Sequence, residues 1–222
     1  NSPPPSRNAI KICTHKNCRK QGSKSLVEIF KDLIPPNDES FVTVYTGGCL
    51  TKCGNGPNIS VSTPTSDVEY GSVTDSTTAS AILEIALDID TPPQLLAAVW
   101  DMEAAVKESR LDNRLAIISS VIERLASSED FSSSHALASA LATRAEIRLS
   151  ASSSNANGAA EDCRRACRAF PHQRALRLLA RAEEMAGNYS AALEATQKWD
   201  TSTPSDELKL KSEIERLKNI IG

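Results

Sequence analysis

The placement of the cysteines constrains this chain more than any other feature of its sequence. Four of its six cysteines lie close to the amino terminus, namely Cys13, Cys18, Cys49 and Cys53. They form a Cys-x4-Cys pair and a Cys-x3-Cys pair with thirty residues between them. Both pairs lie where a segment with a strand pattern ends. Cys13 is the last residue of Ala9–Cys13, and Cys49 follows Phe41–Tyr45. Loops that leave neighbouring strands of a parallel or mixed sheet can meet at one end, so we expect the four thiols to converge.

Four convergent thiolates suit an iron–sulfur cluster or a zinc ion. Zinc sites more often have two residues between paired cysteines, although spacings up to four occur. A disulfide within each pair is another alternative, but a helix-rich chain of 222 residues does not need disulfides to stabilise its fold. His15 is a further alternative ligand, as in Rieske-type sites, although four cysteines already supply a full set.

The first part of the chain has the pattern of a small α/β domain over residues 9–90, preceded by a flexible, Pro-rich arm over residues 1–8. Strands alternate with helical periodicity in the order strand, helix, three strands, helix. The expected elements are Ala9–Cys13, Lys24–Ile34, Phe41–Tyr45, Ile59–Ser62, Val68–Tyr70 and Ser76–Leu87.

The remainder, residues 91–222, has the pattern of an all-helical domain. Thr91 is expected to cap its first helix, with Pro92 in the first turn and Gln94 completing a capping box. Helices are expected over 92–108, 112–127, 132–149, 158–169, 172–186, 189–199 and 205–221. Aromatic residues make up only 4% of the chain, which favours close-packed helices over a large sheet.

The helical part contains two similar stretches in which a helix–turn–helix unit recurs with a period in the mid-thirties. Arg144-Ala145-Glu146 opens one stretch and Arg181-Ala182-Glu183 opens the other. The second resembles a tetratricopeptide repeat (TPR), on the residues Leu176, Leu179, Ala180, Gly187, Tyr189, Ala192 and Pro204. A terminal capping helix is expected to pack an apolar stripe of Leu210, Ile214, Leu217 and Ile221.

Two further groups in the helical part have a functional and a structural interpretation. Cys163 and Cys167 lie one helical turn apart, and we favour small buried packing residues over a second metal site. Five arginines share equivalent helix faces: Arg144, Arg148, Arg174, Arg177 and Arg181. They form either a groove for an acidic peptide or a solvated face with ion pairs to Glu183 and Glu184.

Composition excludes several classes of protein. The net charge is −3 and no long run of Lys or Arg occurs, which argues against a nucleic-acid partner. No apolar stretch approaches the ~20 residues of a membrane-spanning helix. We find no phosphate-binding loop, no Ser/His/Asp set and no His–Glu metalloprotease motif, so a stand-alone enzyme is not expected.

The cysteine segments resemble the thioredoxin-like [2Fe–2S] ferredoxins, a family that includes the small cluster-bearing subunit of respiratory complex I. Ile12-Cys13-Thr14-His15-Lys16-Asn17-Cys18 with Gly22-Ser23 is similar to the first half of the family motif. Gly48-Cys49-Leu50-Thr51-Lys52-Cys53-Gly54-Asn55-Gly56-Pro57 and Tyr70–Thr74 are similar to the second half and the exit hairpin. The resemblance covers about Ala9–Leu87 and implies that Cys13, Cys18, Cys49 and Cys53 ligate the cluster. Thr51 departs from the family, which often has glycine there.

Basic side chains flank the four cysteines, and they are Lys11, His15, Lys16, Arg19, Lys20 and Lys52. Their charge would offset that of an anionic cluster, raise its potential and attract an acidic redox partner. The alternative is that they form solvated surface. The four glycines Gly47, Gly48, Gly54 and Gly56 are expected to let the backbone bend and direct N–H groups at sulfur.

The expected function is therefore an iron–sulfur electron-transfer or cluster-bearing accessory subunit that docks on a larger, membrane-associated complex through its helical repeats. The alternative is a structural or assembly scaffold in which the four-cysteine site only stabilises the small domain. Fusion of this ferredoxin type to helical repeats resembles proteins of plastids, which implies a photosynthetic complex in the chloroplast. Mitochondria are the second expected location.

Overall fold

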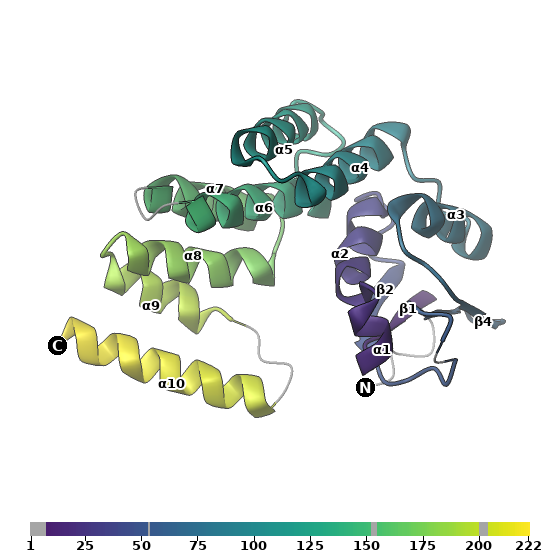
Figure 1. Ribbon diagram of the computed structural model, residues 1–222, viewed down its shortest axis with the longest axis horizontal. Coiled ribbons are helices and arrows are strands. Elements are labelled where there is room, and N and C mark those ends of the chain that lie inside the picture. The colour runs from purple at the N-terminus through teal and green to yellow at the C-terminus, as the bar shows by residue number, and fades with distance from the viewer. Residues whose placement is uncertain (1–7, 53, 152–154, 200–203) are drawn as a thin grey trace. The chain divides into compact units, whose positions relative to one another are not determined.

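The computed structural model of the chain describes residues 8–52, 54–151, 155–199 and 204–222 (Figure 1). The chain divides into two compact units, one ending at Trp100 and the other beginning at Asp101. The first unit contains a small mixed sheet with helices, and the second is helical throughout its described residues. The expected combination of an α/β region and a helical region is therefore confirmed.

The sheet of the first unit has four strands in the order β2-β1-β3-β4. Their bounds are β1 Asn8–Cys13, β2 Val42–Gly47, β3 Ile59–Ser62 and β4 Asp67–Tyr70. Strands β1 and β2 are parallel, whereas β3 is antiparallel to both β1 and β4. Asn8 pairs with Val42, so the predicted flexible arm extends one residue too far into a strand.

Three helices accompany this sheet: α1 Lys16–Lys20, α2 Ser23–Leu33 and α3 Ser76–Leu87. The helical spacing of Leu26, Phe30 and Leu33 places all three on one buried face of α2, which contacts β1, β2 and α3. Asp75 caps α3, because its carboxylate accepts a hydrogen bond of 2.8 Å from the backbone N–H of Thr78.

Helix α4 (Pro93–Lys107) contains the border between the two units. The predicted cap at its start is wrong. The Thr91 hydroxyl donates instead to the backbone carbonyl of Leu33 at 3.2 Å, and the Pro92 carbonyl accepts from the N–H of Leu95 at 2.9 Å. The Thr91 side chain therefore forms a tertiary hydrogen bond in place of the helix cap that the local sequence motif predicted.

Six helices make up the described remainder of the second unit, and successive helices pack on one another (Figure 1). They are α5 Leu111–Ala126, α6 His135–Ala151, α7 Ala156–Ala169, α8 Gln173–Met185, α9 Tyr189–Gln197 and α10 Pro204–Ile221. Helix α6 also contacts α8, and its small side chains Ala138, Ala140 and Ala142 are fully buried. Alanine at these positions lets neighbouring helices approach closely.

The last helix, α10, packs against α9 as a terminal helix would. Leu217 of the predicted apolar stripe is buried, but Ile221 is 47% exposed, so the predicted stripe is wrong at its end. Among the described residues, no helix is both long enough and apolar enough to cross a membrane.

Candidate metal centre

The two cysteine loops leave the same edge of the sheet because β1 and β2 are parallel neighbours. Cys13 ends β1 and stands in register with Gly47, which ends β2 two residues before Cys49. The backbone N–H and the hydroxyl of Thr14 both donate to the Gly47 carbonyl, each at 3.2 Å. These hydrogen bonds hold the start of the first loop against the start of the second.

The described cysteines differ in their exposure. Cys13 and Cys18 are buried and cluster with Leu50, whereas Cys49 is exposed. Cys18 lies on α1, a five-residue helix that the sequence did not predict because it is too short to show a hydrophobic period. Cys53 lies outside the described residues.

The thiol of Cys13 forms hydrogen bonds with the thiols of both Cys18 and Cys49. The charge of Cys49 raises the pKa of Cys18. These three described cysteines do not form a group whose sulfur atoms all lie within 4.8 Å of one another. Cys13 therefore interacts with both other described thiols of the site, although the three do not form one compact group.

The surroundings shift the pKa values of the two buried thiols in opposite directions. Burial opposes ionisation of Cys13, but the backbone N–H groups of His15 and Leu50 and the two neighbouring thiols outweigh it and lower its pKa. Burial raises the pKa of Cys18; the backbone N–H of Asn58 works against this, while the other two thiols raise the pKa further. Cys13 is thus the thiol of this pair that ionises more readily.

Asn58 is a central residue of the site that sequence reasoning missed. It is 2% exposed, and its Nδ2 donates to the Lys52 carbonyl at 2.8 Å and to the Cys18 sulfur at 3.7 Å. Its carbonyl accepts from the N–H of Cys13 at 3.0 Å, and its Oδ1 has no hydrogen-bond partner among the described residues. A polar residue directly before a buried strand, at Pro57-Asn58-Ile59, was the available signal.

The loop between β2 and β3 contains residues with left-handed backbone. Thr51 adopts a φ of 63°, the conformation that glycine takes most readily. The N–H of Thr51 donates to the Cys49 sulfur at 3.3 Å. Of the four glycines expected to bend this loop, Gly54 has a left-handed φ, at 130°.

Gly56 is required for a different reason, which is close packing against the first cysteine loop. A Cβ atom at Gly56 would lie 2.9 Å from the Cys18 sulfur and 2.5 Å from Oε1 of Gln21. Only glycine therefore lets the second loop approach α1 this closely.

The donor set suits a thiolate-bound metal group. The described residues provide three neighbouring thiols, two hydrogen bonds to sulfur from Thr51 and Asn58, and an unpartnered buried amide oxygen on Asn58. Thiolate ligands with hydrogen bonds from neighbouring N–H groups are the environment that iron–sulfur clusters require. Zinc also binds thiolates and is the second metal that such a donor set suits.

The basic side chains around the loops are mostly free of acidic partners. Lys52 pairs with Glu69 at 3.0 Å, and the aliphatic part of Lys11 lies over Gly47. Among the described residues, the exposed His15, Lys16, Arg19 and Lys20 form no ion pair. The face beside the cysteine loops is therefore cationic.

The arginines of α6 and α8 are engaged in ion pairs rather than lining an open groove. Arg144 and Arg148 both bind the buried carboxylate of Asp162, at 2.6 Å each. Arg174 pairs with Glu146, and Arg177 and Arg181 are exposed. Ion pairing is confirmed for three of the five arginines, but the expected solvated face is wrong for Arg144, which is 12% exposed. The predicted partners are also wrong, because Glu183 pairs with Arg164 and Glu184 with Arg216.

The second cysteine pair behaves as packing residues rather than a site. Cys163 is fully buried, and burial raises the pKa of its thiol to about 12, with the charges of Cys167 and Asp162 adding to the shift. Cys167 is half-buried, and burial also raises its pKa. Neither thiol is disposed to ionise near neutral pH.

Comparisons with protein-family models, with curated proteins and with solved structures find no significant match to this chain.

Proposed function

We propose that Cys13, Cys18, Cys49 and Cys53 hold a [2Fe–2S] cluster in a thioredoxin-like ferredoxin domain over residues 9–90. The observation that carries the proposal is the parallel pairing of β1 and β2, which brings the Cys13 and Cys49 loops to one edge of the sheet. When bound, such a cluster supplies one-electron transfer at low to moderate potential.

The protein's own residues would tune that electron transfer. The Thr51 N–H and the Asn58 amide donate to sulfur and so stabilise added negative charge. Lys16, Arg19 and Lys20, which have no ion-pair partner among the described residues, act in the same direction and provide a surface for an acidic redox partner.

The helical residues 91–222, with their TPR-like pattern, then bind the chain to a larger complex. We assign the chain as an electron-transfer or cluster-bearing accessory subunit of a membrane-associated assembly. A photosynthetic complex in the plastid is the proposed setting. Recovery of the chain in purified thylakoid complexes tests that setting, and its recovery with mitochondrial complexes instead would overturn it.

A structural role is the second candidate, and the burial of Cys13 and Cys18 beside Leu50 favours it. Two buried ligands in a small core would make metal binding contribute directly to folding. In that case the chain is a scaffold or assembly factor whose centre does not change oxidation state.

Reduction of the purified chain distinguishes the two candidates. Visible absorption and EPR spectra are recorded before dithionite, after dithionite and after reoxidation by air, on the wild type and on Cys163→Ser as a matched control. Electron transfer predicts a paramagnetic reduced state that appears and disappears reversibly in both proteins. A coloured centre that cannot be reduced and recovered assigns the structural role, and a colourless, EPR-silent chain overturns both forms of the cluster proposal.

A further inference from the structure

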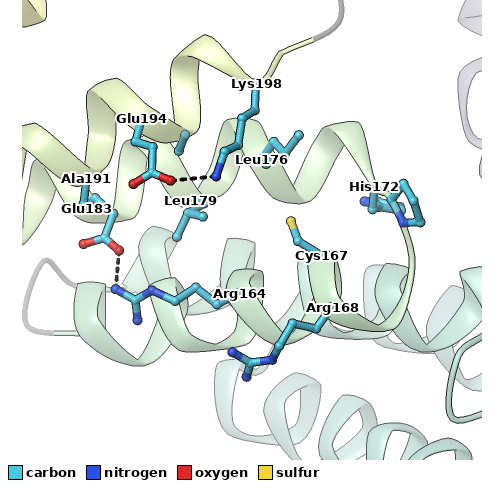
Figure 2. Close-up of a pocket in the computed structure, with 12 residues that line it drawn as sticks. Arg164, Cys167, Arg168, His172, Leu176, Leu179, Glu183, Ala191, Glu194 and Lys198 are labelled. Atoms are coloured by element: carbon cyan, nitrogen blue, oxygen red, sulfur yellow. Dashed lines mark hydrogen bonds and ion pairs between the residues drawn. The ribbon is translucent and has the colours of Figure 1, made fainter.

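Helix α7 lies between two hollows in the helical unit. The larger hollow has a volume of about 570 Å³ and opens between α7, α8 and α9 (Figure 2). The smaller has a volume of about 320 Å³ and lies on the other side of α7, against α5 and α6. Arg168 lines both hollows, so its guanidinium marks the ridge between them.

The larger hollow is apolar at its floor and of a size that binds side chains or small ligands. Leu176 and Leu179 approach it from α8, Ala191 from α9 and Cys167 from α7 (Figure 2). The smaller hollow is more polar, because Arg165, Arg168 and Ser132 contribute to its lining beside Leu137 and Leu141. The larger hollow can therefore accept an apolar side chain from a partner, and the smaller hollow can accept a charged one.

The acidic side chains of the larger hollow are already neutralised. Glu183 is 1% exposed, pairs with Arg164 and accepts a hydrogen bond of 2.9 Å from Asn188 Nδ2. Glu194 pairs with Lys198 at 2.7 Å, as Figure 2 shows. A ligand entering this hollow thus meets no unpaired carboxylate from the described residues.

The cations of α7 are only partly neutralised. Arg165 lines the smaller hollow and has no hydrogen-bond or ion-pair partner among the described residues. Arg168 pairs with Glu161 at 3.2 Å, but both side chains are more than half exposed. An exposed pair of this kind is worth less than about 1 kcal/mol, so a ligand carboxylate can replace Glu161 at little cost.

We propose that α7 is the docking site for an acidic peptide segment of a partner protein. Carboxylates of the peptide pair with Arg168 on the ridge and with Arg165 in the smaller hollow, and an apolar side chain beside them enters the larger hollow. This combination of apolar anchors and charge complementarity is typical of peptide recognition grooves. The surface is distinct from the α6 and α8 faces, whose arginines Arg144, Arg148 and Arg174 bind acids of the chain itself.

Selection from a random dodecapeptide display library tests the proposal, with the full chain as bait. We expect enriched peptides to combine Asp or Glu with Leu, Ile or Phe. The most enriched peptide is then synthesised with fluorescein, and its Kd is measured by fluorescence anisotropy. Failure to enrich peptides, or enrichment without acidic residues, overturns the proposal.

Variants then locate the bound peptide. The double variant Arg165→Ala/Arg168→Ala is expected to raise the Kd at least about tenfold, or ~1.4 kcal/mol. Arg177→Ala, an exposed arginine of α8 that lines neither hollow, is the matched control and should leave the Kd unchanged. Ala191→Met keeps both arginines but fills the larger hollow, and is expected to weaken binding by a similar factor.

Three results would contradict the assignment. Equal weakening by Arg177→Ala would mean that the peptide recognises net charge rather than α7. Direct binding of decanoate by a chain that enriches no peptide would assign the hollows to a small carboxylate. A dimer in sedimentation equilibrium that Arg165→Ala/Arg168→Ala dissociates would assign them to a second copy of the chain. The cysteine site takes no part in these measurements, so their outcome is independent of the cluster proposal.

Discussion

Cys13 and Gly47 are register partners at the carboxyl ends of the parallel strands β1 and β2. This one pairing places the Cys49 loop beside the Cys13 loop, although the two cysteines are far apart in the sequence. A slip of one residue in the register would turn the Cys13 side chain to the opposite face of the sheet. The candidate metal centre therefore depends on the strand register as well as on the residues of the two loops.

Gly56→Ala is predicted to damage the site by forcing the two cysteine loops apart. Its Cβ would meet the sulfur of the buried Cys18 at 2.9 Å, so the Cys18 side chain or the loop must shift, at a cost of about 1–3 kcal/mol. Hydrogen-exchange mass spectrometry of peptides from β1 and α1 measures the loss of protection. Gly48→Ala is the matched control, because nothing lies within 4 Å of a Cβ there, and equal deprotection by both variants would refute the close-packing argument.

Thr51→Gly is predicted to stabilise the loop between β2 and β3. Thr51 has a φ of 63°, a conformation that costs a non-glycine residue roughly 1 kcal/mol. Gly54→Ala should do the opposite, because Gly54 has a φ of 130° and open space for a Cβ, so its penalty comes from the backbone alone. Hydrogen exchange of the loop measures its local stability in the two variants. Destabilisation of the loop by Thr51→Gly would contradict the left-handed backbone of Thr51.

Sequence periodicity predicted the sheet region well where strands and helices carry clear patterns. Ser76–Leu87 matches α3, and Ile59–Ser62 matches β3, because each has a buried face and a turn on both sides. The site was harder to predict, since Asn58 acts through contacts with Cys18 and Lys52 that no local pattern encodes. Thr91 shows the same limit, because a hydrogen bond to Leu33 replaced the expected helix cap.

Asp162→Asn is predicted to destabilise the helical unit strongly. The Asp162 carboxylate is 2% exposed and binds both Arg144 and Arg148 at 2.6 Å. Removing its charge leaves two guanidinium groups without compensation, at a cost of about 3–5 kcal/mol. Thermal unfolding followed by circular dichroism measures the effect. Glu194→Gln, which breaks an exposed pair with Lys198, should change stability by less than about 0.5 kcal/mol, and a similar effect of both variants would refute the role of burial.

The buried Cys163 thiol is predicted to make stability fall at alkaline pH. Its pKa is about 12 in the folded chain and about 9 when exposed, so the folded state favours the neutral thiol. The contribution is complete below pH 9 and is lost as the pH rises towards 12, by up to about 1.4 kcal/mol per pH unit.

Urea unfolding at several pH values between 8 and 11 measures this slope, with Cys163→Ala as the reference that lacks the thiol. The difference between the two proteins should shrink as the pH rises above 9. A constant difference would show that Cys163 titrates alike in both states.

In the helical half, sequence predicted the number and approximate limits of the helices but not their ionic partners. The arginines of α6 were correctly suspected of ion pairing, yet they pair with Asp162 of α7, because packing of α6 on α7 decides which acid is within reach. The hollows beside Arg168 were not predicted either, since they arise where three helices meet.

The account rests on the metal centre, and iron and acid-labile sulfide analysis of the anaerobically purified chain tests it most directly. We predict about two irons and two sulfides per chain, as a [2Fe–2S] centre requires. Cys49→Ser should lose both, and because Cys49 is exposed this variant leaves the core intact, while Cys163→Ser should retain them. One zinc per chain without sulfide, or full iron and sulfide in Cys49→Ser, would contradict the central claim.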